Sequence, residues 1–219
     1  MSSILKVDTI QDTGGNTIIS SDGAGNVTTS NLADNSVSLA KLTATGTKDA
    51  TTFLRGDNTF AEAGGGITEA DMWRLTSGFN SNQDPISSNL ERVDDATFGK
   101  IGTGVSVSSG IWSFPSTGVW LVKMVTQGDT YADSYYSNIY GTSDNSTYDQ
   151  LAYGLSGNNH TNTNFHTFTT ETFFNCTNIS THKIKFTSSG MAGSGNTQVY
   201  GDTSANATYF QFIRLGDSV

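Results

Sequence analysis

From residue 67 to the C-terminus, the sequence is a series of short segments rich in Val, Ile, Thr, Tyr, Phe and Trp, which Gly, Asn, Asp and Ser separate. β-Branched and aromatic residues favour strands, whereas these separators favour turns. No stretch carries the apolar period of an amphipathic helix. Roughly eight to ten short strands over ~150 residues predict a β-sandwich or jelly roll. The expected strands span residues 71–79, 100–108, 110–114, 118–127, 133–141, 147–156, 164–176, 181–189, 196–202 and 207–216.

The densest hydrophobic stretch, GIWSFPSTGVWLV at residues 110–122, holds two of the three Trp residues and one of the two Pro residues. Trp112 and Phe114 share one face of a first strand, and Pro115 presets the backbone for a turn. We therefore predict a β-hairpin here, with Gly118 at the exit of its turn.

The second strand of this stretch, residues 119–125, is apolar on both faces. One face carries Trp120, Val122 and Met124, and the other carries Val119, Leu121 and Val125, interrupted by Lys123. An antiparallel strand with one solvated face alternates more cleanly between apolar and polar residues. We therefore predict that one face packs inside the sandwich, while Val119, Leu121 and Val125 contact a neighbouring subunit of a homotrimer.

Residues 1–66 carry few large apolar side chains, and turn formers such as DTGGNT and SDGAGN lie between them. One copy cannot enclose a core, so these side chains need other chains to bury against. An extended homotrimeric stem meets that need, because each apolar position then contacts its two symmetry mates; a flexible tail is the alternative. Residues 31–42, NLADNSVSLAKL, favour a short helix. The glycines at 64–66 mark the predicted boundary between a stem, 1–66, and a head, 67–219.

The composition restricts the class of partner. Charged residues make up 14% of the chain, well below the usual ~25%. The net charge of −9 disfavours binding to nucleic-acid phosphates, and a single cysteine, Cys176, excludes an intramolecular disulfide. The N-terminal MSSILKVDTIQ lacks the features of an export signal, and no apolar run reaches the ~18 residues of a membrane span. We therefore expect no nucleic-acid binding, no membrane insertion, and release of the protein by cell lysis.

Two segments of the second part resemble a known group of proteins. GIWSFPSTGVWLV and the late segment ATYFQFIRLG, residues 207–216, resemble the jelly-roll head of the first complement component, within the tumour-necrosis-factor superfamily. In that family an aromatic-rich strand leads through a Pro/Gly turn into the next strand, and a late aromatic strand ends the chain. The resemblance covers about residues 70–219 and implies a compact homotrimeric head.

The N-terminal part is similar to another group. SILKVDTIQDTGGNTI, NLADNSVSLAKL and TTFLRGDNTFAE look like segments of tail-fibre and other structural proteins of tailed phages. Together the two resemblances imply an all-β phage virion protein, in which an extended trimeric stem carries a jelly-roll β-sandwich head. They also imply that the N-terminal segment binds other virion proteins and that the protein is assembled into particles in the host cytoplasm.

Two triplets match motifs with known chemistry. Asp12-Thr13-Gly14 matches the aspartic-protease triplet, but that chemistry needs two carboxylates inside a folded cleft. Arg55-Gly56-Asp57 matches the integrin-binding tripeptide, whose function depends on an animal extracellular setting. We interpret both triplets as structural turns.

Metal and catalytic sites are not evident in the sequence. The candidates weighed are His160, His166, His182, Cys176, Asp129, Asp133, Asp144 and Asp149. The histidines lack the spacing that places two ligands on one face, and the aspartates match no defined calcium loop. We predict no catalytic residue, no metal site and no cofactor.

The polar segments between residues 129 and 165 combine tyrosine rings with aspartate, asparagine and glutamine. An aromatic ring stacks on the C–H face of a sugar while polar groups bind its hydroxyls, and loops on a β scaffold often carry binding residues. The alternative is that many of these rings pack within strands. The residues predicted to bind a ligand are Tyr131, Asp133, Tyr135, Tyr148 and Asp149.

The sequence thus predicts a non-enzymatic, homotrimeric fibre or spike of a phage virion, whose head binds a host-surface component, expected to be a glycan. A capsid-mounted decoration protein or head fibre with a structural role is the alternative. A glycan-cleaving enzyme is disfavoured, because that chemistry needs two positioned carboxylates and no such pair is evident.

Overall fold

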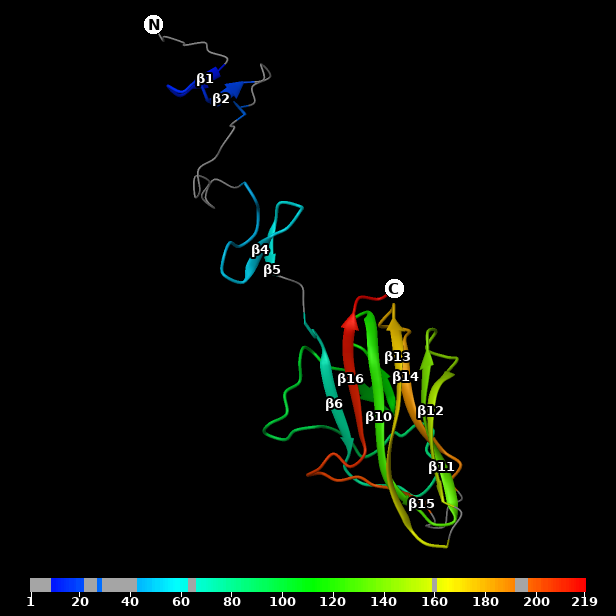
Figure 1. The fold of residues 1–219 in the computed structure, drawn as a ribbon. Helices are drawn as coiled ribbons and strands as arrows, with labels where there is room; N and C mark the ends of the chain where they lie inside the picture. Colours follow the sequence, from blue (N-terminus) through cyan, green and yellow to red (C-terminus); the bar gives the residue numbers. More distant parts are fainter. Residues whose placement is uncertain (1–8, 22–26, 29–42, 63–65, 159–160, 192–196) are drawn as a thin grey trace. The chain divides into compact units, whose positions relative to one another are not determined.

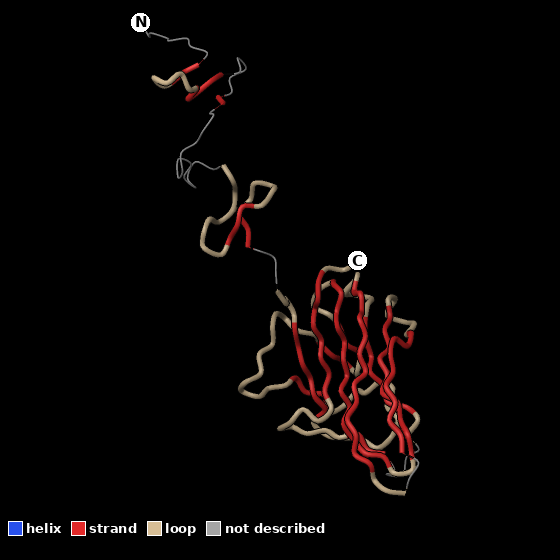
Figure 2. The backbone as a smooth tube through the Cα atoms, viewed as in Figure 1, coloured by secondary structure: helices blue, strands red, loops and turns tan. Residues whose placement is uncertain are grey.

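The computed structural model describes residues 9–21, 27–28, 43–62, 66–158, 161–191 and 197–219 (Figure 1). The chain divides into two compact units, Met1–Gly65 and Gly66–Val219. Every element formed by the described residues is a β-strand (Figure 2), which confirms the all-β prediction. The segment 31–42, predicted as a helix, lies outside the described residues.

The described residues of the first unit form two small antiparallel sheets. Its strands are β1 (Thr9–Gln11), β2 (Thr17–Ser21), β3 (Val27–Thr28), β4 (Thr52–Leu54) and β5 (Phe60–Glu62). Strands β1, β2 and β3 form one sheet, and β4 pairs with β5. Both sequence triplets lie in turns, as predicted. Asp12 Oδ1 accepts hydrogen bonds from the N–H groups of Gly14 and Asn16, and the Asn58 N–H donates to the Arg55 carbonyl.

The second unit is a sandwich of two antiparallel sheets. Its strands are β6 (Ala70–Leu75), β7 (Leu90–Arg92), β8 (Ser106–Ser108), β9 (Ile111–Ser113), β10 (Gly118–Thr130), β11 (Asp133–Thr142), β12 (Asp149–Asn158), β13 (Asn164–Cys176), β14 (Lys183–Ser189), β15 (Thr197–Val199) and β16 (Tyr209–Gly216). The six-stranded sheet has the order β13-β10-β16-β6-β7, with β15 against β10, and the five-stranded sheet has the order β12-β11-β14-β9-β8.

Aromatic side chains from both sheets fill the space between them. Trp112 of β9 is fully buried, and its ring centroid lies 5.0 Å from that of Phe212 and 5.8 Å from that of Phe186. On β10, Trp120, Val122 and Met124 are also fully buried, because alternate side chains of a strand point to the same face. The large side chains of residues 110–122 therefore form the centre of the core.

The hairpin predicted for residues 110–122 is wrong. Strand β9 pairs with β8 and β14 in the five-stranded sheet, whereas β10 pairs with β13, β15 and β16 in the other sheet. The turn around Pro115 therefore carries the chain from one sheet to the other. This crossing brings Phe114 against Trp120 inside the core, with ring centroids 4.9 Å apart.

Candidate ligand-binding site

The residues predicted to bind a ligand are not brought together. Tyr131 and Asp133 lie at the turn between β10 and β11, whereas Tyr148 and Asp149 lie where the loop after β11 enters β12. These positions are at opposite ends of the ten-residue strand β11. At about 3.3 Å per residue, roughly 30 Å separate them, so they cannot contact one small ligand.

Tyr135 is a core residue, which corrects its assignment as a ligand contact. Its side chain is fully buried, and its ring packs against Phe168 with centroids 5.6 Å apart. Its hydroxyl lies 2.9 Å from His166 Nε2. Burial raises the pKa of this hydroxyl, and burial likewise lowers the pKa of His166. The prediction assigned Tyr135 to a polar segment that binds a ligand. In the structure it lies in strand β11, whose side chains alternate between the two faces, and Tyr135 is on the inner face.

Other residues of these polar segments make structural hydrogen bonds or remain on the surface. Asp133 accepts a hydrogen bond from the Thr197 hydroxyl. Tyr131 is 39% exposed at the tip of its turn. Asp144 accepts hydrogen bonds from the N–H groups of Thr147 and Ser146, and these hold the pKa of its carboxyl well below its usual range. Asp144 thus orders the backbone of its own loop, and Asp133 connects β11 to β15.

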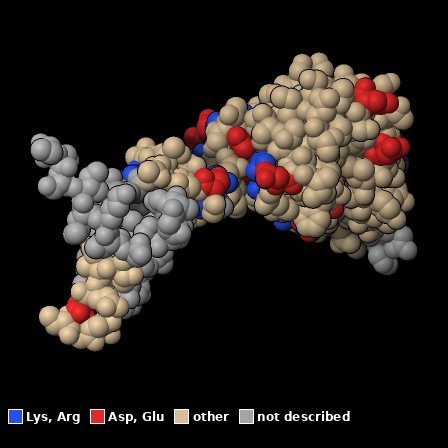
Figure 3. All heavy atoms as spheres, turned by 90° about the horizontal axis from the view of Figure 1, so that it is seen from above, with Lys and Arg blue, Asp and Glu red and all other residues tan. Residues whose placement is uncertain are grey.

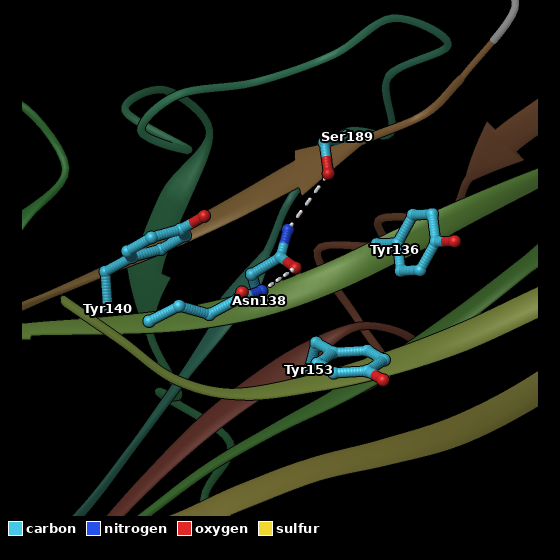
Figure 4. Close-up of a pocket in the computed structure, with 6 residues that line it drawn as sticks. Tyr136, Asn138, Tyr140, Tyr153 and Ser189 are labelled. Carbon is cyan, nitrogen blue, oxygen red and sulfur yellow. Dashed lines mark hydrogen bonds between the residues drawn. The ribbon is translucent and has the colours of Figure 1, made fainter.

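A different set of residues forms a shallow pocket on the outer face of the five-stranded sheet (Figure 4). Its volume is about 390 Å³. It is lined by Tyr136, Asn138 and Tyr140 of β11, Gln150 and Tyr153 of β12, and Ser189 of β14. We call this set the tyrosine groove. Its three β11 residues share one face because they are two residues apart along the strand.

Pairing between the strands assembles the groove. Asn138 lies opposite Tyr153 on β12 and Thr187 on β14, and Tyr136 lies opposite Ser189. Regular pairing would continue from the Asn138–Tyr153 pair to place Leu151 opposite Tyr140. An irregularity between Ile139 and Tyr140 instead places Gln150 there. A β-bulge of this kind redirects side chains, and here it brings an amide into the groove.

Asn138 fixes the polar floor of the groove. Its side chain is buried although it lies on the outer face, because tyrosines flank it. Its Nδ2 donates to Ser189 Oγ at 3.2 Å, and its Oδ1 accepts from Gln150 Nε2 at 2.9 Å (Figure 4). The same Nδ2 also donates to Thr187 Oγ1 at 3.0 Å. With its donors satisfied, Asn138 positions Gln150 and Ser189 rather than binding a ligand itself.

The two ends of the groove differ. At one end, the rings of Tyr136 and Tyr153 pack edge to face with centroids 5.9 Å apart, and Tyr153 is 63% exposed. At the other end, Lys185 Nζ lies 5.2 Å from the ring centroid of Tyr140 and 5.1 Å from that of Tyr148. The same ammonium lies 2.7 Å from Asp84 Oδ1. One end thus offers free aromatic surface, and the other holds a cation that a carboxylate already neutralises.

A second surface lies on the outer face of the six-stranded sheet. Phe173, Leu121 and Ile213 lie side by side on β13, β10 and β16. Phe173 is 70% exposed, whereas Leu121 is half-buried. The next row along the strands contains Lys123 paired with Glu171, with Nζ and Oε2 3.3 Å apart. We call Phe173, Leu121 and Ile213 the apolar row.

The predicted interface residues lie on this same face. Val119 and Leu121 are half-buried, and Val125 is 7% exposed because Tyr209 and Thr169 flank it. Strand β10 therefore has apolar side chains on both faces, as the sequence indicates, but Val125 is already covered within one chain. The sequence did not reveal that Phe173 and Ile213 lie beside Leu121, because only strand pairing brings these three residues together.

Among the described residues, no three His, Cys, Asp or Glu side chains gather where they could share a metal ion. Within the same residues, no helix has the length and apolar character needed to cross a bilayer.

No protein-family model and no curated protein matches this sequence. Among solved structures, the chain is similar to murine APRIL. The crystal structure of murine APRIL at pH 5.0 matches with a TM-score of 0.50 at 10% identity, over 67% of this chain and 98% of that one. A crystal structure of the same protein at pH 8.5 gives a TM-score of 0.47 at 10% identity with equal coverage. The match at a TM-score of 0.50 confirms the predicted jelly-roll sandwich, and at this identity the likeness concerns the fold alone.

Proposed function

We propose that this protein is a non-enzymatic, homotrimeric fibre or spike of a phage virion, and that its second unit binds a glycan on the host surface. The observation that carries the binding part is the tyrosine groove. It presents exposed aromatic rings beside hydrogen-bonded amides and hydroxyls, which is the combination that sugar recognition requires. The groove lies on paired strands, so its side chains are preorganised and lose little freedom on binding.

The apolar row supports the trimeric part of the proposal. A three-fold assembly needs two different patches that meet head to tail. Phe173 lies on the edge strand β13, and a depression of about 110 Å³ between β16 and β6, on the same outer face of the sheet, is lined in part by Ala70, Phe98 and Ile213. An exposed ring from one chain and an apolar depression on the next make a complementary pair. The trimeric stem at residues 1–66 stays a prediction within this proposal.

Trimerisation makes weak binding sites effective. A single shallow groove that binds with a dissociation constant in the millimolar range contributes only about −4 kcal/mol. Three grooves on one trimer, and several trimers on one particle, raise the overall affinity by orders of magnitude without new contacts. Virion localisation, and attachment through the N-terminal segment, rest on the resemblance of residues 1–66 to phage structural proteins.

The function is tested by incubating the purified full-length protein with host bacteria and, separately, with capsids that lack it. Retention on cells supports the receptor-binding proposal. Firm attachment to capsids without any retention on cells would replace it by the decoration role. A variant with Tyr136→Ala and Tyr153→Ala is expected to lose retention on cells while remaining trimeric by sedimentation.

A further inference from the structure

We infer that the tyrosine groove selects an extended neutral oligosaccharide, with at least two sugar rings bound, rather than a single acidic sugar. This inference rests on the proposed function and goes further by naming the chemical class that the site accepts. Four features of the groove carry it: its length, its free aromatic surface, its free hydrogen-bonding groups and its lack of charge.

The length of the groove exceeds one sugar ring. Tyr136 and Tyr140 are four residues apart on the same face of β11, which places them about 13 Å apart at about 3.3 Å per residue. Asn138 lies between them (Figure 4), and its hydrogen-bond partner Gln150 lies opposite Tyr140 on β12. A single pyranose on the Tyr136–Tyr153 pair would leave the other end of the groove empty, so a chain of sugars fits the whole surface.

The free aromatic surface is at the Tyr153 end. Tyr153 is 63% exposed, and the neighbouring Leu155, which lies opposite Tyr136, is 54% exposed. Leu155 thus extends the apolar platform beyond the edge-to-face pair of Tyr136 and Tyr153. The platform suits the C–H face of a pyranose, and we expect the first sugar ring to stack there.

The polar middle of the groove offers neutral groups. Gln150 Nε2 uses one hydrogen on Asn138 and keeps the other, while Ser189 accepts from Asn138 and keeps its hydroxyl hydrogen to donate. Such groups match the hydroxyls of a second sugar ring. All six residues that line the groove are uncharged.

The charge around the groove disfavours an acidic ligand. The nearby cation, Lys185, is 18% exposed and is paired with Asp84. On the face that Figure 3 shows, charged side chains form a few separate patches among uncharged residues. The chain as a whole carries a net charge of −9. An anionic sugar would therefore approach a negatively charged protein without finding a free cation in the groove.

The inference is tested with the full-length protein on immobilised polysaccharides. The neutral series is dextran, mannan and galactan; the acidic series is alginate and polygalacturonate. We expect retention on at least one neutral polymer. The retention should persist between about 0.1 and 1 M NaCl, across which the Debye length falls from about 10 to about 3 Å. Oligosaccharides of the retained polymer, from one to four rings, should bind with at least a roughly tenfold gain between one and three rings by calorimetry.

Three variants locate the site. Tyr153→Ala should weaken binding of the three-ring ligand about tenfold, because it removes the stacking platform, whereas Tyr153→Phe should keep most of the affinity. Tyr131→Ala is the matched control, since Tyr131 is also an exposed tyrosine but lies at the β10–β11 turn. Its affinity should equal that of the unmodified protein.

The alternative outcomes separate this inference from the proposed function. Retention on the acidic polymers alone, suppressed by salt, would overturn the neutral-ligand inference and leave receptor binding standing. Binding to host cells without binding to any neutral polymer would have the same consequence. Retention on a neutral polymer that Tyr153→Ala leaves unchanged would place the site outside the groove. If the protein is retained on neither cells nor polymers, the receptor function itself fails.

Discussion

Replacing Leu121 with aspartate is expected to dissociate the trimer without unfolding the subunit. Leu121 lies between Phe173 and Ile213 on the outer face of the six-stranded sheet, in strand β10. In one chain it is half-buried, and the proposed interface would cover the rest. An aspartate at this position can still be solvated in the isolated subunit, but in the trimer its carboxylate would face apolar side chains.

The magnitude follows from these two environments. Full burial of a leucine side chain contributes about 1.5–3 kcal/mol, so the part that the trimer adds is about 1 kcal/mol. Burying a polar group without a partner costs a further ~1–3 kcal/mol. The sum is about 2–4 kcal/mol per subunit, or about 6–12 kcal/mol per trimer. At 1.4 kcal/mol per tenfold, the dissociation constant of the trimer rises at least ~10⁴-fold. Because dissociation releases three chains, the midpoint concentration rises with the square root, by at least about a hundredfold.

Sedimentation velocity at micromolar concentration measures this shift. The unmodified protein should sediment as one species at three times the chain mass of 23.2 kDa, and the Leu121→Asp variant should sediment as a monomer. Leu155→Asp is the matched control, because Leu155 is 54% exposed on the other sheet and its replacement should leave the trimer intact. Near-ultraviolet circular dichroism checks that both variants keep the packed aromatic core. A monomeric unmodified protein, or a Leu121→Asp variant that remains a trimer at the same concentration, would refute the proposed interface.

Two further predictions concern the stability of the sandwich. Burial lowers the pKa of His166 below its ordinary 6.5, so the unfolded chain binds a proton more readily than the folded one below that pH. The folded state should therefore be fully stable above pH 6.5 and lose stability as the pH falls below it. The variant His166→Gln should show a smaller fall in Tm between about pH 7 and pH 5. An equal fall in the variant would contradict this assignment. Trp112→Ala should cost about 3–5 kcal/mol in urea unfolding because it leaves a cavity among the rings that contact it. Trp112→Phe should cost less than about 1.5 kcal/mol, because phenylalanine keeps an aromatic ring in the core. It also removes an indole N–H that has no hydrogen-bond partner among the described residues. Equal losses for the two variants would show that this argument is wrong.

The sequence predicts the strands of the sandwich well where alternation and β-branched or aromatic residues agree. Residues 164–176 are expected to form one strand, and β13 covers that range. Strand β7 is missed, because Leu90–Arg92 carries two charged residues and no β-branched one. Ion pairs with β6 explain the position of β7. Arg74 of β6 is almost fully buried, and its guanidinium lies 3.0 Å from Glu91 of β7 and 3.1 Å from Asp95, which follows β7. Such ion pairs join residues far apart in the chain, so local propensity does not reveal them.

The connection after β9 shows a different limit. A strand, a Pro-containing turn and a second strand have the same local pattern in a hairpin and in a crossing between two sheets. In both arrangements Trp112, Phe114 and Trp120 can point toward a core. Strand pairing decides between the two arrangements. Here β9 pairs with β14, whereas β10 pairs with β13 and β16. Strand pairing here depends on residues more than thirty positions away, beyond the range of turn chemistry.

The candidate site depends on pairing in the same way. The period of two along residues 133–141 is sufficient to place Tyr136, Asn138 and Tyr140 on one face, so this part of the groove could be predicted from the sequence. That Tyr153 lies beside Asn138 depends on the register between β11 and β12, and that Gln150 faces the groove depends on the irregularity at Tyr140. A slip of one residue in this pairing would turn the β12 side chains to the opposite face and remove both Tyr153 and Gln150 from the groove. The sequence supplies the residue types for sugar binding, but the register of the sheet selects which of them form one site.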